Sequence, residues 1–388
     1  MSFNKWENIS IGDVCQTISE THKTKKGELI FLNTGDIERG KILHNKYSSV
    51  AKMPGQAKKS IKKGDILFSE IRPANGRWAY VDFEANDFIL STKLMVIRAN
   101  EKVNSRYLYH LLTSPEIVKL LQQLAETRSG TFPQITFTQV ANIQIKLPTI
   151  PAQNKIASFF DALDRKIELN RLTNQTLENI AQTLFREMCL PKSEVLPDGW
   201  KVEKLDNLIE TVSITHKMKQ EEIIFLNTSD ILEGNILNND YSLVSTLPGQ
   251  AKKSIKRSDI LFSEIRPANK RYAFVNFDAD DYVVSTKLMV LRSKGINPYL
   301  IYCFLTNNDT LKELQHLAET RSGTFPQITF TQLKDFQIVI PDEETLDKVS
   351  KNIQDIYENI FLNNKETQTL IALRDSLLPK LMKGEIAI

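Results

Sequence analysis

The sequence predicts an α+β protein in which two copies of one α/β domain alternate with two long antiparallel coiled-coil helices. Three observations support this prediction: long strings of residues occur twice, each copy contains short strand-like runs, and each copy ends in a heptad pattern. A duplicated chain can place its halves about a pseudo-two-fold axis, as a symmetric dimer does. We therefore expect the two domains to be related by such an axis.

The duplication is close to letter for letter. LAETRSGTFPQITFTQ occupies residues 124–139 and returns unchanged at 317–332, and ILFSEIRPAN at 66–75 returns at 260–269. GQAKKSIK at 55–62 returns at 249–256. A two-fold object is the natural partner of such a chain, and duplex DNA with an inverted repeat is one.

The pattern divides the chain into four segments, which are 1–148, 149–192, 193–341 and 342–388. The first and third are the globular copies. In the first copy, the runs 29–32, 66–71, 79–83 and 94–98 are apolar or alternating and are bounded by turn residues, as strands are. Residues 107–124 have helical spacing interrupted by Pro115. We expect an α+β domain built on a curved sheet.

The second and fourth segments have apolar residues at alternating steps of three and four, which is the a/d pattern of a coiled coil. Both begin with proline and a capping residue, Pro148–Thr149 and Pro341–Asp342. The predicted seam consists of Ile156, Phe160, Leu163, Ile167 and Asn170 in one helix and Val349, Ile353, Ile356, Ile360 and Asn363 in the other. We predict that Asn170 and Asn363 meet, which costs stability but fixes register; alternatively both lie at a solvated edge of the seam.

Composition limits the class of protein. The 388 residues are 41% hydrophobic and 25% charged with a net charge of +3, which is ordinary for a soluble protein. Cys15, Cys189 and Cys303 form neither a metal spacing nor a disulfide framework, which suits a reducing cytoplasm. No signal-peptide or membrane-spanning pattern is present. A surface for nucleic acid must therefore be a local concentration of Lys and Arg.

The first such concentration is GQAKKSIKK and its copy. The basic side chains that we predict to bind DNA phosphates there are Lys58, Lys59 and Lys62 in the first copy and Lys252, Lys253 and Lys256 in the second. Clustered ammonium groups give affinity without sequence information, because they release counterions from the phosphates. The alternative is an ordinary solvated turn.

The second concentration is SEIRPANxR, in which proline ends a strand and begins a loop. Its candidate base-reading residues are Arg72, Asn75 and Arg77, with copies Arg266, Asn269 and Arg271. Arginine matches the N7/O6 edge of guanine, and asparagine matches the N6/N7 edge of adenine. The alternative is a structural Arg72 that pairs with Glu70 or Asp82.

The third candidate is TRSGTFPQ. It supplies Arg128, Ser129, Thr131 and Gln134, with copies Arg321, Ser322, Thr324 and Gln327. Backbone at the glycine can approach a phosphate closely, and Phe132–Pro133 makes the loop rigid. The alternative is a hinge between domain and helix.

No catalytic constellation accompanies these segments. The sequence has no phosphate-binding GxxxxGK[ST], no dinucleotide glycine pattern, no [N/D]PP-aromatic tetrad and no GxSxG elbow. We expect a chain that recognises DNA and is not an enzyme, and that holds no metal ion.

Three further strings complete the pattern: LPDGW at 196–200, SGTFPQIT at 129–136 and 322–329, and LLPKL at 377–381 followed by GEI at 384–386. In this order, on a duplicated layout, the whole chain resembles the specificity subunit of Type I restriction–modification systems. The resemblance implies that each globular copy is a target-recognition domain. It also implies that the helices space the domains and dock partner subunits.

The resemblance implies the partners as well. These are double-stranded DNA, two modification (methyltransferase) subunits and restriction/motor subunits, with no membrane. No cofactor is bound by this chain; S-adenosylmethionine would belong to the modification subunits, which would methylate an adenine flipped out of each half-site. Family members usually carry two dissimilar domains. The near-identical copies here predict a bipartite palindromic site with an unspecified gap.

Other functions remain open from sequence alone. A stand-alone regulator would bind an inverted repeat without enzymatic partners, and an architectural spacer would have no sequence preference. The helix residues Phe159, Leu172, Ile180 and Phe185 lie off the seam; they are candidate docking surfaces for partners, or they pack against the chain's own domains.

Overall fold

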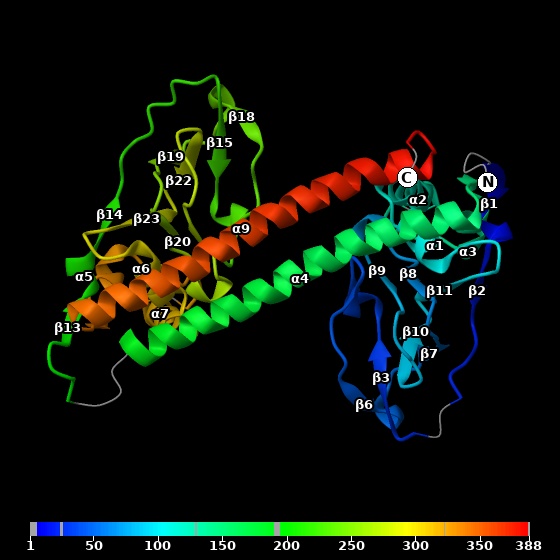
Figure 1. Ribbon diagram of the computed structural model, residues 1–388, viewed down its shortest axis with the longest axis horizontal. Helices are drawn as coiled ribbons and strands as arrows, with labels where there is room; N and C mark the ends of the chain where they lie inside the picture. Colours follow the sequence, from blue (N-terminus) through cyan, green and yellow to red (C-terminus); the bar gives the residue numbers. More distant parts are fainter. Residues whose placement is uncertain (1–5, 24–25, 129, 190–194, 322, 387–388) are drawn as a thin grey trace. The chain divides into compact units, whose positions relative to one another are not determined.

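The computed structural model describes residues 6–23, 26–128, 130–189, 195–321 and 323–386. Its contacts divide the chain into two compact units. The first unit is Met1–Leu169 with Glu366–Ile388, and the second is Asn170–Lys365. Each unit therefore contains one globular copy together with part of both long helices (Figure 1).

The first unit contains two four-stranded sheets, in the orders β2-β11-β8-β9 and β6-β3-β10-β7, and the pairs β1-β12 and β4-β5. The strands are β1 (Glu7–Ser10), β2 (Cys15–Ile18), β3 (Glu28–Leu32), β4 (Ile37–Glu38), β5 (Lys41–Ile42), β6 (Tyr47–Ser49), β7 (Ala57–Ser60), β8 (Ile66–Ser69), β9 (Trp78–Tyr80), β10 (Phe88–Ser91), β11 (Leu94–Ala99) and β12 (Gln144–Leu147). The helices are α1 (Ser105–Leu112), α2 (Pro115–Arg128), α3 (Phe137–Ala141) and the start of α4 (Ile150–Cys189).

The second unit repeats this order with sheets β14-β23-β20-β21 and β18-β15-β22-β19 and pairs β13-β24 and β16-β17. The strands are β13 (Lys201–Lys204), β14 (Ile209–Val212), β15 (Glu222–Leu226), β16 (Ile231–Leu232), β17 (Asn235–Ile236), β18 (Tyr241–Leu243), β19 (Ala251–Ser254), β20 (Ile260–Ser263), β21 (Tyr272–Phe274), β22 (Tyr282–Ser285), β23 (Leu288–Ser293) and β24 (Gln337–Ile340). The helices are α5 (Leu205–Leu208), α6 (Pro298–Thr306), α7 (Asn308–Arg321), α8 (Phe330–Leu333) and α9 (Glu343–Met382).

Strand β8 shows how one sequence supplies two cores. Side chains alternate between the faces of a strand. Ile66 and Phe68 therefore join the core under α1 and α2, while Leu67 joins a second core between the two sheets. All four residues of β8 are buried, because the central sheet is covered on both faces. In Figure 1 the outer sheet, with β3 and β6, lies on the side away from α4.

The predicted α+β class, the duplication and the two long helices are confirmed. The sheet topology was not predicted from the sequence; each unit has two four-stranded sheets that share a core. Strands β6, β7 and β10 have three or four residues each; β6 and β7 are largely polar and β10 is a short apolar run, so none of them has a clear period-two pattern. The interruption at Pro115 is correct, since α1 ends at Leu112 and α2 begins at Pro115.

The long helices pack antiparallel within each unit. In the first unit, Lys166 pairs with Glu366 at 2.9 Å and Asp164 with Arg374 at 3.0 Å. Residue numbers therefore increase in opposite directions along α4 and α9. In the second unit, Phe185 and Val349 share one core. The helices begin at residues 150 and 343, next to the predicted starts. Asp342 caps α9 by accepting a hydrogen bond from the backbone N–H of Thr345 at 3.0 Å.

All predicted seam residues are buried or half-buried. They also belong to the domain cores, since Ile156 and Phe160 pack with Leu378 and Leu381 around the α1 core. Asn170 is 3% exposed, and its Nδ2 donates to the backbone carbonyl of Asn363 at 3.4 Å. The two asparagines meet, and the solvated-edge alternative does not apply to Asn170.

No helix in the described part of the chain combines the length and apolar content that crossing a membrane requires. Within the same ranges, no group of three or more His, Cys, Asp or Glu residues is arranged to hold a metal ion.

Candidate nucleic-acid interface

Two segments of the first unit that are distant in sequence meet beyond the end of β8. The Nη2 of Arg72 donates a hydrogen bond to the carbonyl of Thr131 at 3.2 Å, and its backbone N–H donates to the carbonyl of Pro133 at 3.0 Å. Ile71 and Gln134 form an antiparallel bridge. The predicted second and third candidate segments thus form one surface.

The second unit reproduces this junction. Arg266 donates from Nη2 to the carbonyl of Thr324 at 3.4 Å and from its backbone N–H to the carbonyl of Pro326 at 3.1 Å. We call this surface the loop patch. It consists of Arg72, Ala74, Asn75, Gly130, Thr131, Phe132 and Gln134 in the first unit, and of Arg266, Ala268, Asn269, Gly323, Thr324, Phe325 and Gln327 in the second. The glutamines are half-buried and the other members are exposed.

The backbone of Arg72 is left-handed, with φ 44° and ψ 78°, and Arg266 has φ 44° and ψ 81°. This conformation costs an arginine about 1–3 kcal/mol and persists only where surrounding contacts fix it. Those contacts are the two bonds to the 131–133 loop and the next turn, in which the N–H of Ala74 donates to Oε1 of Gln122 at 3.0 Å. These contacts offset the strain and hold the guanidinium against the loop.

The structure does not support the alternative in which Arg72 forms an ion pair with Glu70 or Asp82. The side-chain partner of Arg72 is a carbonyl oxygen of the loop, and the side chain is exposed. Arginine has five N–H donors. An exposed guanidinium with one such bond therefore keeps donors for a base edge or a phosphate.

Lys59 is placed differently from the other predicted lysines. Its Nζ donates to the carbonyls of Thr92 and Leu94 at 3.1 and 2.7 Å, and burial lowers the pKa of the ammonium. Lys253 repeats these bonds at 3.0 and 2.8 Å. Each ammonium group thus connects its strand, β7 or β19, to the backbone segment that follows β10 or β22.

The remaining lysines of the group are exposed but stand at different ends of the sheet. Lys58 lies beside Lys59, which bonds the 92–94 segment, and the carbonyl of Lys93 in that segment accepts a hydrogen bond from Glu70 near the loop patch. Lys62 precedes β8, whereas Arg72 follows it. Four residues of strand span about 13 Å. Lys62 is thus separated from Arg72 by the length of β8, whereas Lys58 lies on β7 next to Lys59.

Arg77 and Arg271 are half-buried and tie neighbouring loops together. Nη1 of Arg77 donates to the carbonyl of Ile37 at 3.1 Å, and Nη1 of Arg271 donates to those of Ser229 and Ile231 at 3.0 Å. These contacts account for both arginines structurally.

The predicted Ser129 and Ser322 lie outside the described residues. Arg128 and Arg321 are the last residues of α2 and α7, so their backbone flanks the loop patch. The described members that sequence analysis did not select are Ala74 and Phe132, while Gly130 was selected for its backbone alone. No sequence signal marks Phe132 as exposed, since the FP pair was interpreted as a stiffener.

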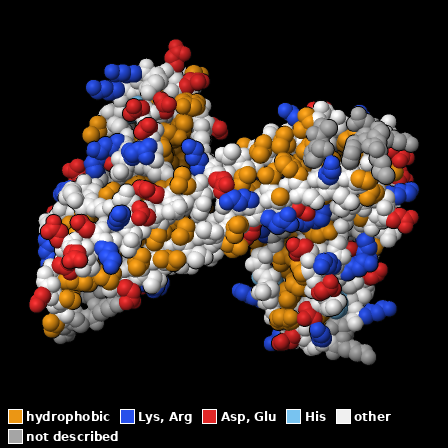
Figure 2. Space-filling model, in the orientation of Figure 1, with side chains coloured by type: hydrophobic (Ala, Val, Ile, Leu, Met, Phe, Trp, Pro, Cys, Tyr) orange, Lys and Arg blue, Asp and Glu red, His pale blue; other side chains and the backbone are white. Residues whose placement is uncertain are grey.

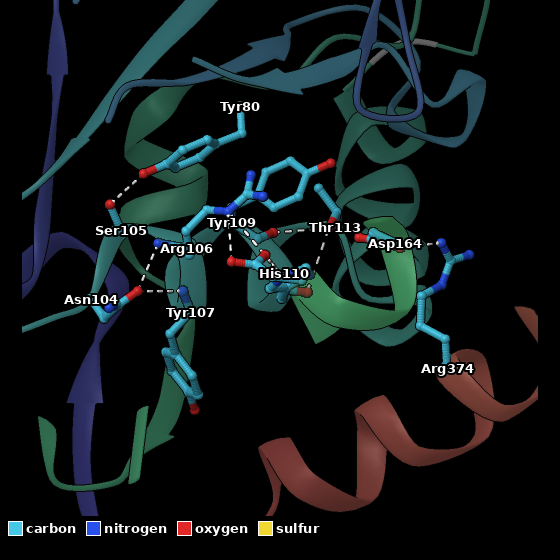
Figure 3. A network of polar contacts seen from close by, with 11 residues as sticks. Tyr80, Asn104, Ser105, Arg106, Tyr107, Tyr109, His110, Thr113, Asp164 and Arg374 are labelled. Carbon is cyan, nitrogen blue, oxygen red and sulfur yellow. Dashed lines mark hydrogen bonds and ion pairs between the residues drawn. The ribbon is translucent and has the colours of Figure 1, made fainter. Parts of the chain in front are cut away.

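A second polar cluster lies inside the first unit, around a cavity of about 560 Å³ between the domain and the helix ends. Nε2 of the buried His110 lies 2.9 Å from Oδ1 of Asp161, and Arg106 bonds the same carboxylate. Figure 3 shows Arg106 and His110 with Tyr80 and Tyr109, and the Asp164–Arg374 pair beyond them. Burial opposes ionisation of Asp161, but the bonds from His110 and Arg106 outweigh it and lower the pKa of the carboxyl.

The helix residues proposed as docking surfaces divide into two groups. Phe185 is fully buried, with its ring 6.0 Å from that of Phe304, and Phe159 is half-buried beside Phe160. Leu172 and Ile180 are 47% and 45% exposed. Figure 2 shows hydrophobic side chains reaching the surface along the helices. Of these four residues, Leu172 and Ile180 are the exposed ones.

One protein family matches both halves of the chain, and specificity subunits of restriction enzymes are similar to it over most of its length. The family described as Type I restriction modification DNA specificity domain matches the chain twice, at residues 4–179 and 197–372. The Type I restriction enzyme HindI specificity subunit of Haemophilus influenzae is 30% identical over 459 aligned positions, which cover 98% of this chain and 99% of that protein. The MjaIX specificity subunit of Methanocaldococcus jannaschii is 26% identical over 84% of this chain and 78% of its own length.

A solved structure shares the fold. The S subunit of a Type I restriction–modification system from M. genitalium superposes with a TM-score of 0.63 at 14% identity, covering 98% of this chain and 97% of that one.

Proposed function

Because this chain belongs to the Type I restriction–modification DNA specificity family, we propose that its two loop patches read the two halves of one bipartite site. The chain is a DNA sequence-specificity subunit and not itself an enzyme. The observation that supports the finer proposal is the identity of the loop patch in the two units. Equal readers require equal half-sites, so the proposed target is a palindrome interrupted by an unspecified gap.

Within each half-site, Arg72, Asn75 and Gln134 are the proposed base readers. Their guanidinium and amide groups offer the paired donors and acceptors that distinguish bases in the major groove. Lys58, Thr131, Arg128 and Ser129 are the proposed phosphate contacts, which fix position but carry no sequence information. The copies in the second unit have the same roles. We leave Lys59 and Arg77 out, because their polar groups bond carbonyls of the chain itself.

The proposed partners are two methyltransferase subunits and restriction/motor subunits that act in the cytoplasm. The modification subunits would use S-adenosylmethionine to methylate an adenine of each half-site after flipping it out. The exposed Leu172 and Ile180 on α4 are the proposed contact for one of them. The helices would set the gap, so inserting one heptad into both should lengthen the gap between selected half-sites.

The test is selection of random-sequence duplexes by the full chain co-purified with its modification subunits. The expected result is an inverted repeat with a fixed gap. Recovery of two unlike half-sites would overturn the palindrome, and recovery of no preference would overturn the assignment of the loop patch. The comparisons do not favour a stand-alone regulator. Selection of the same site by the chain without its partner subunits would be the result that supports it.

A matched pair of variants tests which end of the sheet faces DNA. Lys58→Ala with Lys252→Ala should weaken binding to all duplexes alike and reduce its salt dependence by the counterions lost. Lys62→Ala with Lys256→Ala is the control, because these exposed lysines belong to the same repeated string but precede β8 and β20. Equal effects of the two double variants would contradict our orientation.

A further inference from the structure

Each loop patch carries an aromatic ring at its tip. Phe132 is 71% exposed and Phe325 is 72% exposed, more than any other described phenylalanine. One exposed apolar side chain is ordinary in a globular protein. These two are distinguished by the polar groups around them, Arg72 and Thr131 in one unit and Arg266 and Thr324 in the other.

The backbone on both sides of the ring is fixed. The carbonyl of Thr131, before Phe132, and that of Pro133, after it, both accept hydrogen bonds from Arg72. Pro133 is buried, and the next contact, from the N–H of Ile135 to the carbonyl of Glu70, is 2.8 Å long. The phenylalanine is thus presented on an anchored loop, and little backbone entropy remains to be lost on binding.

The second unit fixes Phe325 in the same way. Both flanking carbonyls accept from Arg266, Pro326 is buried, and the N–H of Ile328 donates to the carbonyl of Glu264 at 2.8 Å. The two rings therefore have the same support within their own units.

We propose that Phe132 and Phe325 are wedges that enter the duplex between two stacked base pairs, one in each half-site. This inference rests on the proposed function, because it takes the loop patch as the surface that meets DNA. Rigid apolar side chains flanked by cationic and polar groups unstack base steps in this way in proteins that kink DNA. The ring stacks on a base face, while Arg72 remains within reach of a phosphate or base edge beside it.

The wedge assigns a second kind of specificity to the loop patch. Unstacking is least costly at flexible pyrimidine–purine steps, so the inserted ring favours such a step without any hydrogen bond to it. It also lowers the cost of extruding a neighbouring base, because part of the stacking is already lost. A steric and deformability preference thus accompanies the hydrogen-bond readout.

The experiment uses the full chain co-purified with its modification subunits and duplexes carrying the selected site. 2-Aminopurine placed at successive positions of the half-site reports unstacking as an increase in fluorescence. The variants are Phe132→Ala with Phe325→Ala, and the corresponding double replacements by Leu and by Trp. The control is Leu43→Ala with Leu237→Ala, since these leucines are 52% and 57% exposed at matching positions outside the loop patch.

We expect the wild-type complex to raise the fluorescence at one step of each half-site. The alanine variant should lose that signal and bind about 5- to 150-fold more weakly, the range of one aromatic–base contact. Tryptophan should retain the signal, leucine should retain part of it, and the leucine-to-alanine control should behave as wild type. Thermal unfolding of each variant checks that it is folded.

Two results would overturn the wedge while leaving the proposed function intact: selection of the same site with no unstacking by the wild type, or an alanine variant with undiminished signal and affinity. Loss of modification subunits from the alanine variant with DNA binding retained would identify the rings as a protein contact, which also refutes the wedge. Failure of selection to yield any site would instead refute the proposed function.

Discussion

The two units carry the same loop patch on different interiors. In the first unit, the region between domain and helices contains Arg106, His110 and Asp161 beside a cavity. The equivalent positions of the second unit are Tyr299, Cys303 and Gln354. The surfaces that are proposed to meet DNA have been kept alike, whereas the supporting cores have diverged.

The second unit fills this region with aromatic rings. Phe274 stacks on Tyr299 at 4.4 Å and on Phe361 at 5.8 Å, and Tyr302 and Tyr357 pack edge to face at 5.1 Å. Burial raises the pKa of Tyr299 to about 12. Packing tolerates hydrophobic substitution when volume is conserved. The sequence of such a core can therefore change while the residues of the loop patch remain the same.

The largest expected effect is one that the units share. Asp65 is fully buried and receives two hydrogen bonds from Arg98 at 2.7 and 2.8 Å, and Asp259 with Arg292 repeats both distances. Arg98→Leu and Arg292→Leu should each destabilise their own unit by about 3–5 kcal/mol, because a buried carboxylate is left uncompensated. Hydrogen exchange resolved by unit measures this, and a clear inequality would show that the central sheets of the two units differ in stability as well.

A smaller effect should distinguish the interiors. Phe361 occupies in the second unit the position that Glu168 occupies in the first. Phe361→Ala should cost about 1.5–3 kcal/mol of lost apolar burial. Glu168→Ala should cost less than about 1 kcal/mol, because its partner Lys41 is half exposed. Equal losses in thermal unfolding would contradict the contrast.

The loop patches should respond alike when altered one at a time. Arg72→Ala should relax sequence choice at one position of one half-site by about 1–3 kcal/mol, and Arg266→Ala should relax the matching position of the other half-site equally. Binding selection with each single variant measures the change. If only one substitution alters the selected sequence, the proposed equivalence of the two readers fails.

The smallest effect concerns acid stability of the first unit. The lowered pKa of Asp161 means that its carboxylate stabilises the folded state above the ordinary aspartate range near pH 4, and that this contribution is lost as pH falls through the lowered value. Asp161→Asn should remove about 1–2 kcal/mol at neutral pH and flatten the dependence between pH 5 and 2. Gln354→Asn, at the matching site, should leave that dependence unchanged.

Sequence periodicity predicted the secondary structure well for helices with one buried face and for strands that are buried along their whole length. The strands at residues 29–32, 66–71 and 94–98, the break at Pro115 and both long helices were predicted close to their observed limits. Strand β9 is shorter than predicted, Trp78–Tyr80 instead of 79–83, and the other three strands of the outer sheet, β6, β7 and β10, were missed. Short polar strands that pair only through tertiary contacts leave no periodic signal.

The candidate site was predicted as three separate segments with equal weight for each basic residue. The chemistry of Arg72, Asn75 and Thr131 was evident from residue type and repetition. The sequence did not show that Lys59 and Arg77 bond backbone carbonyls inside the unit. The partners of a cation depend on which part of the backbone folds beside it.

The sequence by itself determined the duplication, the α+β class, the helix seam with its asparagines, and the family, since all of these are encoded in order, spacing and identity of residues. Only the tertiary structure decided which cations remain exposed, that Arg72 adopts a left-handed backbone to hold the 131–133 loop, and that Phe132 lies at the surface. These outcomes depend on contacts between segments about 60 residues apart, and local propensity carries no information about such contacts.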